Sequence, residues 1–340
     1  MQNLAIGFIG TGGIGAQHAQ GMRALPEHFR LVTASDTSAQ ALTRFGDAYG
    51  IGRRHADYRH LLADPEVEAV VILLPHHLHE QVATEALASG KHVLLEKPIA
   101  RSLAEADRII QAARSSRRTL MIGHNQRFDH RHAQVARLLT AGALGRPLTV
   151  RIDHLQHFNP PAQSWWRSLD QVGGGCVIGS GIHRLDLLRW WFGEVDEVYA
   201  QLQWDASRLE GEVACTATLR FHSGVQAEFL CHWGIHRPVQ CESLFITGVD
   251  GTLTITGDEP GRQSLAPHHE HLPVPDDPSA APESMWRHFH RCVTTGAAPL
   301  TSGEEGRASL ALVLDVVRSG TLRAPVHCAT SPALQQHGRI

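Results

Sequence analysis

The first residues with a chemical signature form a glycine-rich loop near the amino terminus. Gly10, Thr11, Gly12, Gly13, Ile14 and Gly15 match the pattern GxGxxG, directly after an apolar run and before a stretch with helical spacing. In that context the first glycine permits a tight turn, the second lets the backbone approach a pyrophosphate, and the third lets the helix pack on the strand. The free amides at the helix start bind phosphate oxygens. The pattern predicts a dinucleotide-binding loop, and a tight turn without a ligand is the alternative.

An acidic residue supports the dinucleotide interpretation. Asp36 closes the second apolar run, 21 residues after Gly15, where an acid hydrogen-bonds the ribose hydroxyls of NAD. Its charge repels a 2′-phosphate, and its neighbours Thr37 and Ser38 offer no cation. We therefore expect NAD as the cofactor in preference to NADP.

Histidine, a common metal ligand, is frequent in the sequence. The chain has 24 histidines, several of them in local groups such as 76, 77 and 79 or 268, 269 and 271. No group supplies three or four ligands at a spacing that suits zinc, so no metal is expected. The six cysteines are widely spaced without a CxxC pair and predict reduced thiols.

The elements that carry these residues alternate in the first part of the chain. Apolar runs predict strands at 4–9, 31–34, 69–74, 92–95 and 120–122, and helical spacing predicts helices at 14–25, 38–49, 78–88 and 103–115. Strands that are apolar throughout and separated by amphipathic helices indicate a parallel sheet covered on both faces. Residues 1–122 are thus expected to form an NAD-binding, doubly wound Rossmann domain.

The pattern changes after residue 123. Expected strands lie at 149–157, 198–204, 213–221, 225–231, 243–247 and 252–256, expected helices at 132–141, 183–191 and 304–318, and a loop at 266–282. Period-two alternation and short glycine-containing connections predict that sequential strands pair in one mainly antiparallel sheet. Residues 123–340 are expected to form an α/β domain for substrate binding and oligomerisation.

Composition excludes several classes of protein. The chain has 340 residues, of which 42% are hydrophobic and 19% charged, as in ordinary globular proteins and unlike disordered, collagenous or coiled-coil chains. The net charge of -3 does not suit nucleic-acid binding. No apolar run approaches the roughly 18 residues of a membrane helix, and no secretory signal is visible, so a cytoplasmic location is expected.

Four segments carry a family resemblance. They are the Gly-Phe-Ile-Gly-Thr-Gly-Gly-Ile-Gly stretch at 7–15, Glu96-Lys97-Pro98, the stretch at 123–128 and the stretch at 173–186. Together they resemble the glucose-fructose oxidoreductase, inositol dehydrogenase and rhizopine-catabolism (Gfo/Idh/MocA) family. The resemblance implies a Rossmann domain followed by an α/β domain with an open sheet. It also implies reversible hydride transfer between a nicotinamide and a carbon that bears a hydroxyl, on sugars, inositols and related polyols.

Two residues are candidates for proton transfer. Lys97 follows a parallel strand at the edge where such sheets bind ligands, and desolvation there would lower its pKa. By resemblance, His183 stands beside the nicotinamide and acts as general base, Glu96 contacts the cofactor ribose, and Pro98 shapes the turn, often as a cis peptide.

The chain departs from the family at two places. Relatives commonly carry an Asp four residues before the catalytic His, where this chain has Gly179. Another group could substitute (Asp153, His154, His157 or Asp186), the proton relay could differ, or catalysis could be weakened or lost. Relatives also have Thr-Pro-Asn-x-x-His near the cofactor; here Pro75 and His79 match, and His76 replaces the Asn.

Further residues are expected at the substrate by resemblance. Arg127, Ser180 and Asp186 occupy positions that face the sugar in similar dehydrogenases, and His157 is grouped with them. Trp165, Trp166 and Arg167 belong to a loop expected to cap the site. The alternatives are an ion pair for Asp186 and core positions for the tryptophans.

Three functions follow from these observations. The leading one is an NAD-dependent oxidoreductase that acts on a secondary alcohol or ketone of a sugar, inositol or sugar-derived substrate. The second is redox-neutral, NAD-dependent cleavage of a glycoside, and the third, motivated by Gly179, is a non-catalytic NAD sensor. An antiparallel sheet with one uncovered apolar face predicts a homo-oligomer, either a dimer or a tetramer.

Overall fold

The computed structural model describes residues 3–234, 241–259, 262–267 and 283–328. Two compact units make up the chain, and each is described by itself. The first comprises Met1–His124 and Glu283–Arg307, and the second comprises Asn125–Pro282 and Ala308–Ile340. Several expected features, including most of the loop at 266–282 and the histidines at 268, 269 and 271, lie outside the described residues.

The first unit is built on a six-stranded sheet. Its order is β3-β2-β1-β4-β5-β6, and every neighbouring pair is parallel. The strands are β1 (Leu4–Ile9), β2 (Phe29–Ser35), β3 (Arg53–His55), β4 (Ala69–Ile72), β5 (His92–Leu95) and β6 (Leu120–Ile122). All residues of β1 and β4 are buried, which is why these runs lack polar alternation. This confirms the expected doubly wound fold.

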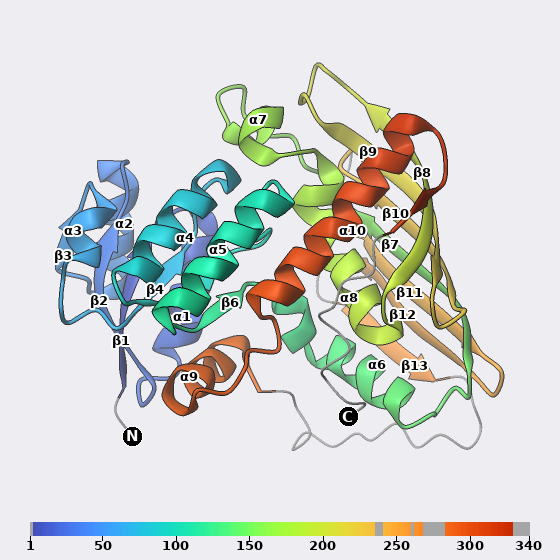
Figure 1. Cartoon of the computed structure of the whole chain (residues 1–340), viewed down its shortest axis with the longest axis horizontal. Coiled ribbons are helices and arrows are strands. Elements are labelled where there is room, and N and C mark those ends of the chain that lie inside the picture. Colours follow the sequence, from blue (N-terminus) through green and yellow to red (C-terminus); the bar gives the residue numbers. More distant parts are fainter. Residues whose placement is uncertain (1–2, 235–240, 260–261, 268–282, 329–340) are drawn as a thin grey trace. The chain divides into compact units, whose positions relative to one another are not determined.

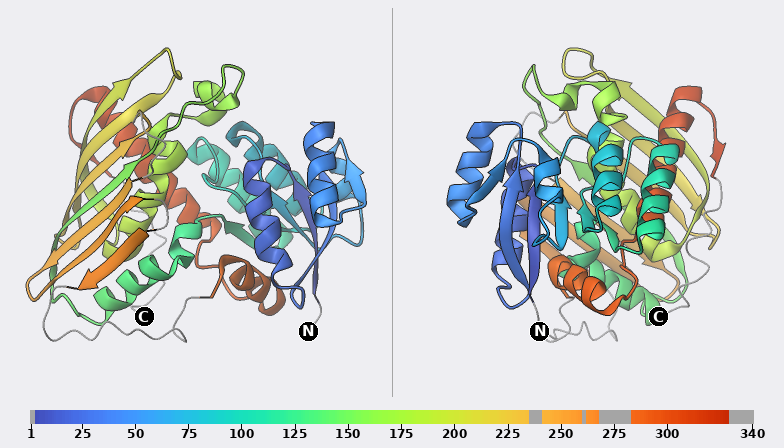
Figure 2. Two further views of the ribbon diagram at one scale, coloured as in Figure 1. Left: turned by 180° about the vertical axis from the view of Figure 1, so that it is seen from behind. Right: turned by 60° about the vertical axis from the view of Figure 1, so that its left-hand side comes forward.

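Helices cover both faces of this sheet. They are α1 (Gly13–Arg23), α2 (Ala39–Tyr49), α3 (Tyr58–Leu62), η1 (His76–Leu78), α4 (His79–Ala88) and α5 (Leu103–Ser116). In Figure 1, α4 and α5 lie in front of the strands, and in Figure 2, seen from behind, α1 lies in front. Local signals set the helix ends, as at α2, where the Ser38 side chain caps the start and Gly50 (φ 70°) ends the helix.

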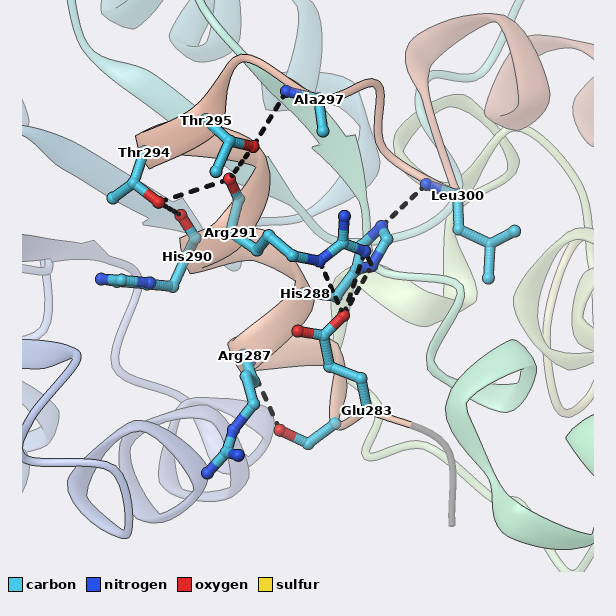
Figure 3. A network of polar contacts seen from close by, with 10 residues as sticks. Glu283, Arg287, His288, His290, Arg291, Thr294, Thr295, Ala297 and Leu300 are labelled. Carbon is cyan, nitrogen blue, oxygen red and sulfur yellow. Dashed lines mark hydrogen bonds and ion pairs between the residues drawn. The ribbon is translucent and has the colours of Figure 1, made fainter. Parts of the chain in front are cut away.

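A late segment returns to the first unit. Helix α9 (Met285–Thr295) precedes Thr301, whose carbonyl accepts from Ile122 N (2.8 Å) and whose hydroxyl donates to Ile122 O (2.7 Å). Figure 3 shows the contacts that brace the segment, including Leu300 N donating to His288 Nε2 at 2.9 Å. We expected residues 123–340 to form one domain, whereas residues 283–307 belong to the first unit. The difference arises because the pairing of Thr301 with Ile122 of β6 is a tertiary contact that local sequence patterns do not indicate.

The second unit is built on an eight-stranded mixed sheet. Its order is β13-β12-β11-β7-β10-β9-β8-β14. The strands are β7 (Pro147–Leu155), β8 (Val195–Trp204), β9 (Glu212–Phe221), β10 (Gln226–His232), β11 (Cys241–Gly248), β12 (Thr252–Glu259), β13 (Arg262–Pro267) and β14 (Val326–His327). Strand β7 lies between β10 and β11, parallel to β10 and antiparallel to β11. Purely sequential pairing is therefore wrong at this point, although β8-β9-β10 and β11-β12-β13 do pair in sequence.

Most of the remaining helical residues belong to the second unit. The remaining helices are η2 (Asn125–Phe128), α6 (His130–Thr140), η3 (Trp165–Arg167), α7 (Leu169–Val172), the π-helical turn η4 (Val177–Gly181), α8 (Ile182–Phe192) and α10 (Gly303–Leu322). α6, α8 and the second-unit part of α10 lie on one side of the sheet, in front of it in Figure 1 and behind it in the left view of Figure 2.

The other side of this sheet is mostly polar. Along β8, Ala200 and Leu202 are buried, whereas Gln201 and Gln203 are exposed, and exposed Tyr199 and Phe245 are among the larger apolar groups there. The described strands thus do not present the uncovered apolar face on which we based the expectation of an oligomer. The oligomer itself stays a prediction.

Cys176, Cys215, Cys231, Cys292 and Cys328 are free thiols. In the part of the chain that the structure describes, every helix is too short or too polar to cross a membrane.

Candidate active site

The glycine loop connects β1 to α1 in the first unit. Gly10 has φ of 92°, and a Cβ there would lie 2.5 Å from Leu73 O, so the turn requires glycine. Gly12 and Gly13 face open space, with nothing within 4 Å of an added Cβ. At Gly15 a Cβ would lie 3.3 Å from the Phe45 ring, where the helix packs closely. The loop therefore leaves the backbone amides at Gly12 and Gly13 open to close approach by a ligand.

Asp36 is hydrogen-bonded to this loop. Its Oδ2 accepts from both the amide and the hydroxyl of Thr11, each at 2.8 Å, and its Oδ1 accepts from Ser38 N at 2.8 Å. The carboxylate thus holds the glycine loop against the end of β2. This bracing is a role that the spacing rule does not reveal.

The residues present fit a dinucleotide. The start of α1 carries free amides beside two glycines, which form a cradle that a Cβ would fill. The carboxylate of Asp36 is only partly buried, so it is positioned at the strand end where ribose hydroxyls bind in this fold. The expected cofactor and its loop agree in chemistry and in place.

Lys97 follows β5 at the carboxyl edge of the parallel sheet. The Lys97-Pro98 peptide is cis, and Lys97 N donates to Glu96 Oε2 at 3.1 Å. Burial lowers the pKa of Lys97, and the neighbouring charge of Glu96 opposes that shift. Burial alone would raise the pKa of Glu96, but the hydrogen bond from His18 and the charge of Lys97 hold it below its usual value.

His18 is a residue that sequence analysis missed. It lies in α1, its side chain is 3% exposed, and its Nε2 is 2.9 Å from Glu96 Oε1. Its Nδ1 accepts from Trp286 Nε1 at 3.3 Å. A histidine three residues after the last glycine of the loop was the available signal, but its partners come from β5 and α9 and become neighbours only in the fold.

His79 lies in the core rather than on the surface of the loop. It is fully buried, with Nδ1 2.8 Å from Pro98 O and Nε2 2.9 Å from Leu74 O. Burial lowers its pKa. Since both ring nitrogens face backbone carbonyls, the geometry favours a role in fixing the Glu96-Lys97-Pro98 turn over direct cofactor contact. Pro75 precedes η1, and His76 is 3% exposed.

His183 lies in the second unit as the second residue of α8. It is partly buried and follows the π-helical turn Val177–Gly181, a feature that often marks functional sites. The buried carboxyl group of Glu212 accepts from Val177 N at 3.0 Å at the start of this turn, and burial raises its pKa. The turn thus has a side-chain cap supplied by β9.

Trp233 occupies the space beside Gly179. A Cβ on Gly179 would overlap Cη2 and Cζ2 of the Trp233 ring and would lie 3.2 Å from the Trp166 ring. Trp233 is 2% exposed, and its Nε1 donates to Ser180 Oγ. The position that carries a carboxylate in similar proteins therefore faces an indole here, and no larger side chain fits without movement.

The expected capping tryptophans belong to the same aromatic cluster. Trp165 and Trp166 are stacked at 4.1 Å between ring centroids, and Trp166 meets Trp233 edge-on at 5.8 Å. Phe158 contacts Trp233 at 4.5 Å. Trp165 and Trp166 are only partly buried, so they are not simple core residues.

Arg167 and His157 also lie near this loop in the sequence. Arg167 donates to Ser207 O and is partly buried, whereas His157 is exposed. The backbone of His157 forms an isolated bridge with Gly234, which joins its segment to the residues after Trp233.

Arg127 and Asp186 form a buried ion pair. The guanidinium donates twice to the carboxylate, at 2.8 Å each, and the side chains are 2% and 1% exposed. Ser309 Oγ also donates to Asp186 Oδ1 at 2.7 Å. The expected contacts of Arg127 and Asp186 with substrate do not fit this geometry, because the two side chains already pair with each other inside the second unit. The alternative, an ion pair for Asp186, fits it.

The other suggested substitutes for the missing carboxylate also have partners. Asp153 Oδ2 accepts from Ser243 Oγ at 2.7 Å. His154 is buried beside Glu242, with Nδ1 3.5 Å from Oε1, and Glu242 is paired with Arg184. Burial lowers the pKa of His154. Neither group is poised to replace an aspartate at 179, where an indole stands instead.

A cavity of about 420 Å³ lies elsewhere in the first unit. It is lined at the amino ends of the strands by Leu4, Glu68, Lys91, His92 and Arg118 among others, away from the carboxyl edge that carries Lys97. Within the described ranges, histidine, cysteine and acidic side chains form no cluster of three that could hold a metal ion.

Comparison with known proteins identifies the family. Residues 4–124 match the model of the oxidoreductase family with an NAD-binding Rossmann fold, and residues 132–258 match the GFO/IDH/MocA C-terminal domain. The chain belongs to the GFO/IDH/MocA oxidoreductase family. It is therefore an NAD-dependent oxidoreductase.

Individual members of the family align over most of the chain. The 1,5-anhydro-D-fructose reductase of Ensifer adhaerens is 28% identical over 85% of this chain and 88% of that protein. The myo-inositol 2-dehydrogenase of Thermotoga maritima is 28% identical over 91% and 94%. The crystal structure of aldose-aldose oxidoreductase from Caulobacter crescentus, complexed with glycerol, has a TM-score of 0.86 and 27% identity, covering 96% of this chain and 100% of that one.

Proposed function

We propose that this GFO/IDH/MocA oxidoreductase transfers a hydride between NAD and a secondary alcohol or ketone carbon of a sugar, inositol or sugar-derived substrate. Lys97 and His183 serve as its proton-handling residues. The observation that carries the proposal is the Glu96-Lys97-Pro98 turn, which places a lysine of lowered pKa at the carboxyl edge of the Rossmann sheet. That edge is where doubly wound sheets bind their ligands.

The residues of the first unit hold the cofactor in this proposal. The amides at Gly12 and Gly13 bind the pyrophosphate, and Asp36 binds the ribose hydroxyls while it braces Thr11. The nicotinamide supplies a hydride acceptor in one direction and a hydride donor in the other. Glu96 is an ionised acceptor next to Lys97 and is available to ribose or substrate hydroxyls.

The protein's own task is to move the hydroxyl proton. During oxidation the alcohol O–H bond must break as hydride leaves the carbon, so a base accepts the proton and nearby donors stabilise the developing charge. The Lys97 ammonium supplies such a donor, and burial lowers its pKa, which eases release of its proton. His183, at the start of α8 after the π-helical turn, is the base in this scheme because a neutral imidazole nitrogen accepts a proton.

The substrate class rests on the relatives and on the aromatic cluster. The relatives are named for an anhydro sugar, an inositol and aldoses. The partly buried rings of Trp165 and Trp166 provide flat apolar surfaces for the C–H face of a sugar ring. Polyol oxidation therefore remains the leading activity, ahead of glycoside cleavage and of a sensor.

The proposal extends to assembly and location. A homo-oligomer, dimer or tetramer, would use the helix-free face of the mixed sheet, where Tyr199 and Phe245 are exposed among polar side chains. Four buried free cysteines and one partly buried one suit the reducing cytoplasm. Light scattering on the purified protein tests the assembly, and a monomer at all accessible concentrations contradicts it.

The experiment follows nicotinamide absorbance with NAD and a panel of inositols, aldoses, sugar acids and glycosides. Lys97→Arg keeps the charge but cannot release a proton, and Lys97→Met removes both. We expect reduction of NAD by the wild type on at least one polyol and its loss in both variants, with NADH binding retained. NAD binding without reduction, together with cleaved glycoside in the mixture, would establish the redox-neutral alternative; binding without any turnover would establish the sensor.

A further inference from the structure

A chain of hydrogen bonds runs through the first unit from Trp286 to Lys97. Trp286 Nε1 in α9 donates to His18 Nδ1 at 3.3 Å. His18 Nε2 in α1 lies 2.9 Å from Glu96 Oε1, and Glu96 Oε2 accepts from Lys97 N at 3.1 Å. Three segments far apart in the sequence thus converge on one carboxylate.

The indole fixes which nitrogen of His18 bears the proton. An indole N–H only donates, so His18 Nδ1 must be the acceptor and carries no hydrogen. The ring proton then resides on Nε2 and points at Glu96. The side chain of His18 is 3% exposed, so water does not compete for this arrangement.

The packing around Trp286 is built for this contact. Gly21, three residues after His18 on the same face of α1, would overlap the indole ring if it carried a Cβ. The indole and the imidazole meet edge-on, with centroids 6.2 Å apart. A larger residue at position 21 would displace the donor from His18.

We propose that Trp286 and His18 are positioning residues, which hold the carboxylate of Glu96 ionised beside Lys97 and thereby control proton exchange by that lysine. This inference rests on the function proposed above. Burial alone would raise the pKa of Glu96, and His18 is the first of the groups that lower it. Glu96 in turn raises the pKa of Lys97 against the effect of burial.

Other titratable groups act on the same carboxylate. Lys97 lowers the pKa of Glu96 directly, and Glu96 raises that of His79 in α4. His79 faces two backbone carbonyls, so its main effect is on the turn. His18 is the group whose removal changes the hydrogen bonding of Glu96 without touching the turn itself.

The composition of the chain provides a direct probe. Its 340 residues contain two lysines, Lys91 and Lys97. Lys91 donates to Asp64 O and Val67 O, each at 2.8 Å, at the opposite edge of the sheet. Incorporation of lysine with ¹³C at Cε therefore gives two NMR signals whose shifts report ionisation, assigned by Lys91→Arg.

The full-length protein is titrated without cofactor or substrate. In His18→Leu the Glu96 carboxylate loses the hydrogen bond that holds it ionised beside Lys97, so Glu96 takes up a proton or turns away. Lys97 then lacks its anionic neighbour, and its signal should titrate lower by about one pH unit, the lower end of the effect of one nearby opposite charge. Trp286→Phe should shift it in the same direction by less. His18→Gln keeps an amide donor for Glu96 and should restore most of the wild-type value, and the Lys91 signal should not move.

Two further results test whether His18 acts on Lys97 through Glu96. In a Glu96→Gln background, His18→Leu should add no shift at Lys97; an added shift, or an unchanged Lys97 midpoint in both His18→Leu and Trp286→Phe, would overturn the inference. If His18→Leu does not fold, Trp286→Phe and His18→Gln carry the same comparison. Turnover that survives Lys97→Met refutes the proposed function while leaving these NMR results intact, so the two failures are distinguishable.

Discussion

The indole of Trp233 lies where a side chain at Gly179 would have to go. A Cβ on Gly179 overlaps two ring atoms of Trp233, and the indole N–H is bound to the adjacent Ser180. The absence of the family's aspartate at position 179 is therefore coupled to a second residue, Trp233, which directly follows β10 in the sequence. Gly179, which lies one helical turn before His183, and Trp233 thus form a matched pair.

Gly179→Ala should destabilise the protein by about 1–3 kcal/mol, the usual cost of overpacking a rigid site. The cost should nearly vanish in a Trp233→Leu background, since neighbouring residues in contact are not additive. Urea unfolding of the four proteins measures the coupling. Equal costs in both backgrounds would show that the ring does not fill this position.

Introducing the family's carboxylate should require removal of the indole. Gly179→Asp alone is expected to lower soluble yield, because it combines overlap with burial of a charge. Gly179→Asp with Trp233→Ala should fold and should raise the apparent pKa of His183 in the pH–rate profile, because a nearby carboxylate favours imidazolium. Trp233→Ala alone is the matched control; a profile identical to that of the double variant contradicts the expectation.

Breaking the Arg127–Asp186 pair should affect stability before substrate affinity. Arg127→Met or Asp186→Asn leaves a buried group without its ionic partner and should cost about 3–5 kcal/mol. The double variant Arg127→Met with Asp186→Leu should recover part of that loss. Chemical denaturation gives the free energies of unfolding. Unchanged stability with a raised KM would return both residues to the substrate site.

Acid should weaken the second unit through His132. Burial lowers its pKa from 6.5 to about 4, so between those values the unfolded chain binds more protons and stability falls as pH decreases. A shift of this size corresponds to about 3–4 kcal/mol, fully present above pH 6.5 and lost as pH falls to 4. His132→Asn keeps a donor for Gln126 O, which accepts at 3.1 Å in the wild type. Urea midpoints at several pH values should show a shallower slope in this variant.

Asp36 should govern the choice of cofactor. Asp36→Ser removes the charge that repels a 2′-phosphate and weakens the bracing of Thr11, so NADPH should bind roughly 10-fold more tightly and NADH more weakly. Thr11→Val removes only the hydroxyl bond to Asp36 and should weaken NADH without improving NADPH. Fluorescence titration of both cofactors checks these shifts. NADPH affinity that does not change in Asp36→Ser would contradict the assignment.

Local patterns predicted most of the elements, because burial on both faces leaves an apolar run and burial on one face leaves an alternation. Strand β1 was expected at 4–9 and is found at Leu4–Ile9, and α8 was expected at 183–191 and is found at Ile182–Phe192. The glycine loop and Asp36 also have a fixed spacing along the chain. Their position in the fold was therefore accessible from sequence.

Contacts between distant segments were decided only by the tertiary structure. Thr301 pairs with Ile122, and β7 inserts between β10 and β11, although spacing gives no signal for either. The same holds for Trp286 with His18 and for Arg127 with Asp186. The sequence by itself determined the family, the cofactor loop and the candidate Lys97 and His183, because these depend on local spacing. Which polar groups are already satisfied, and which ring fills the space at Gly179, depended on packing among residues that only the folded chain brings together.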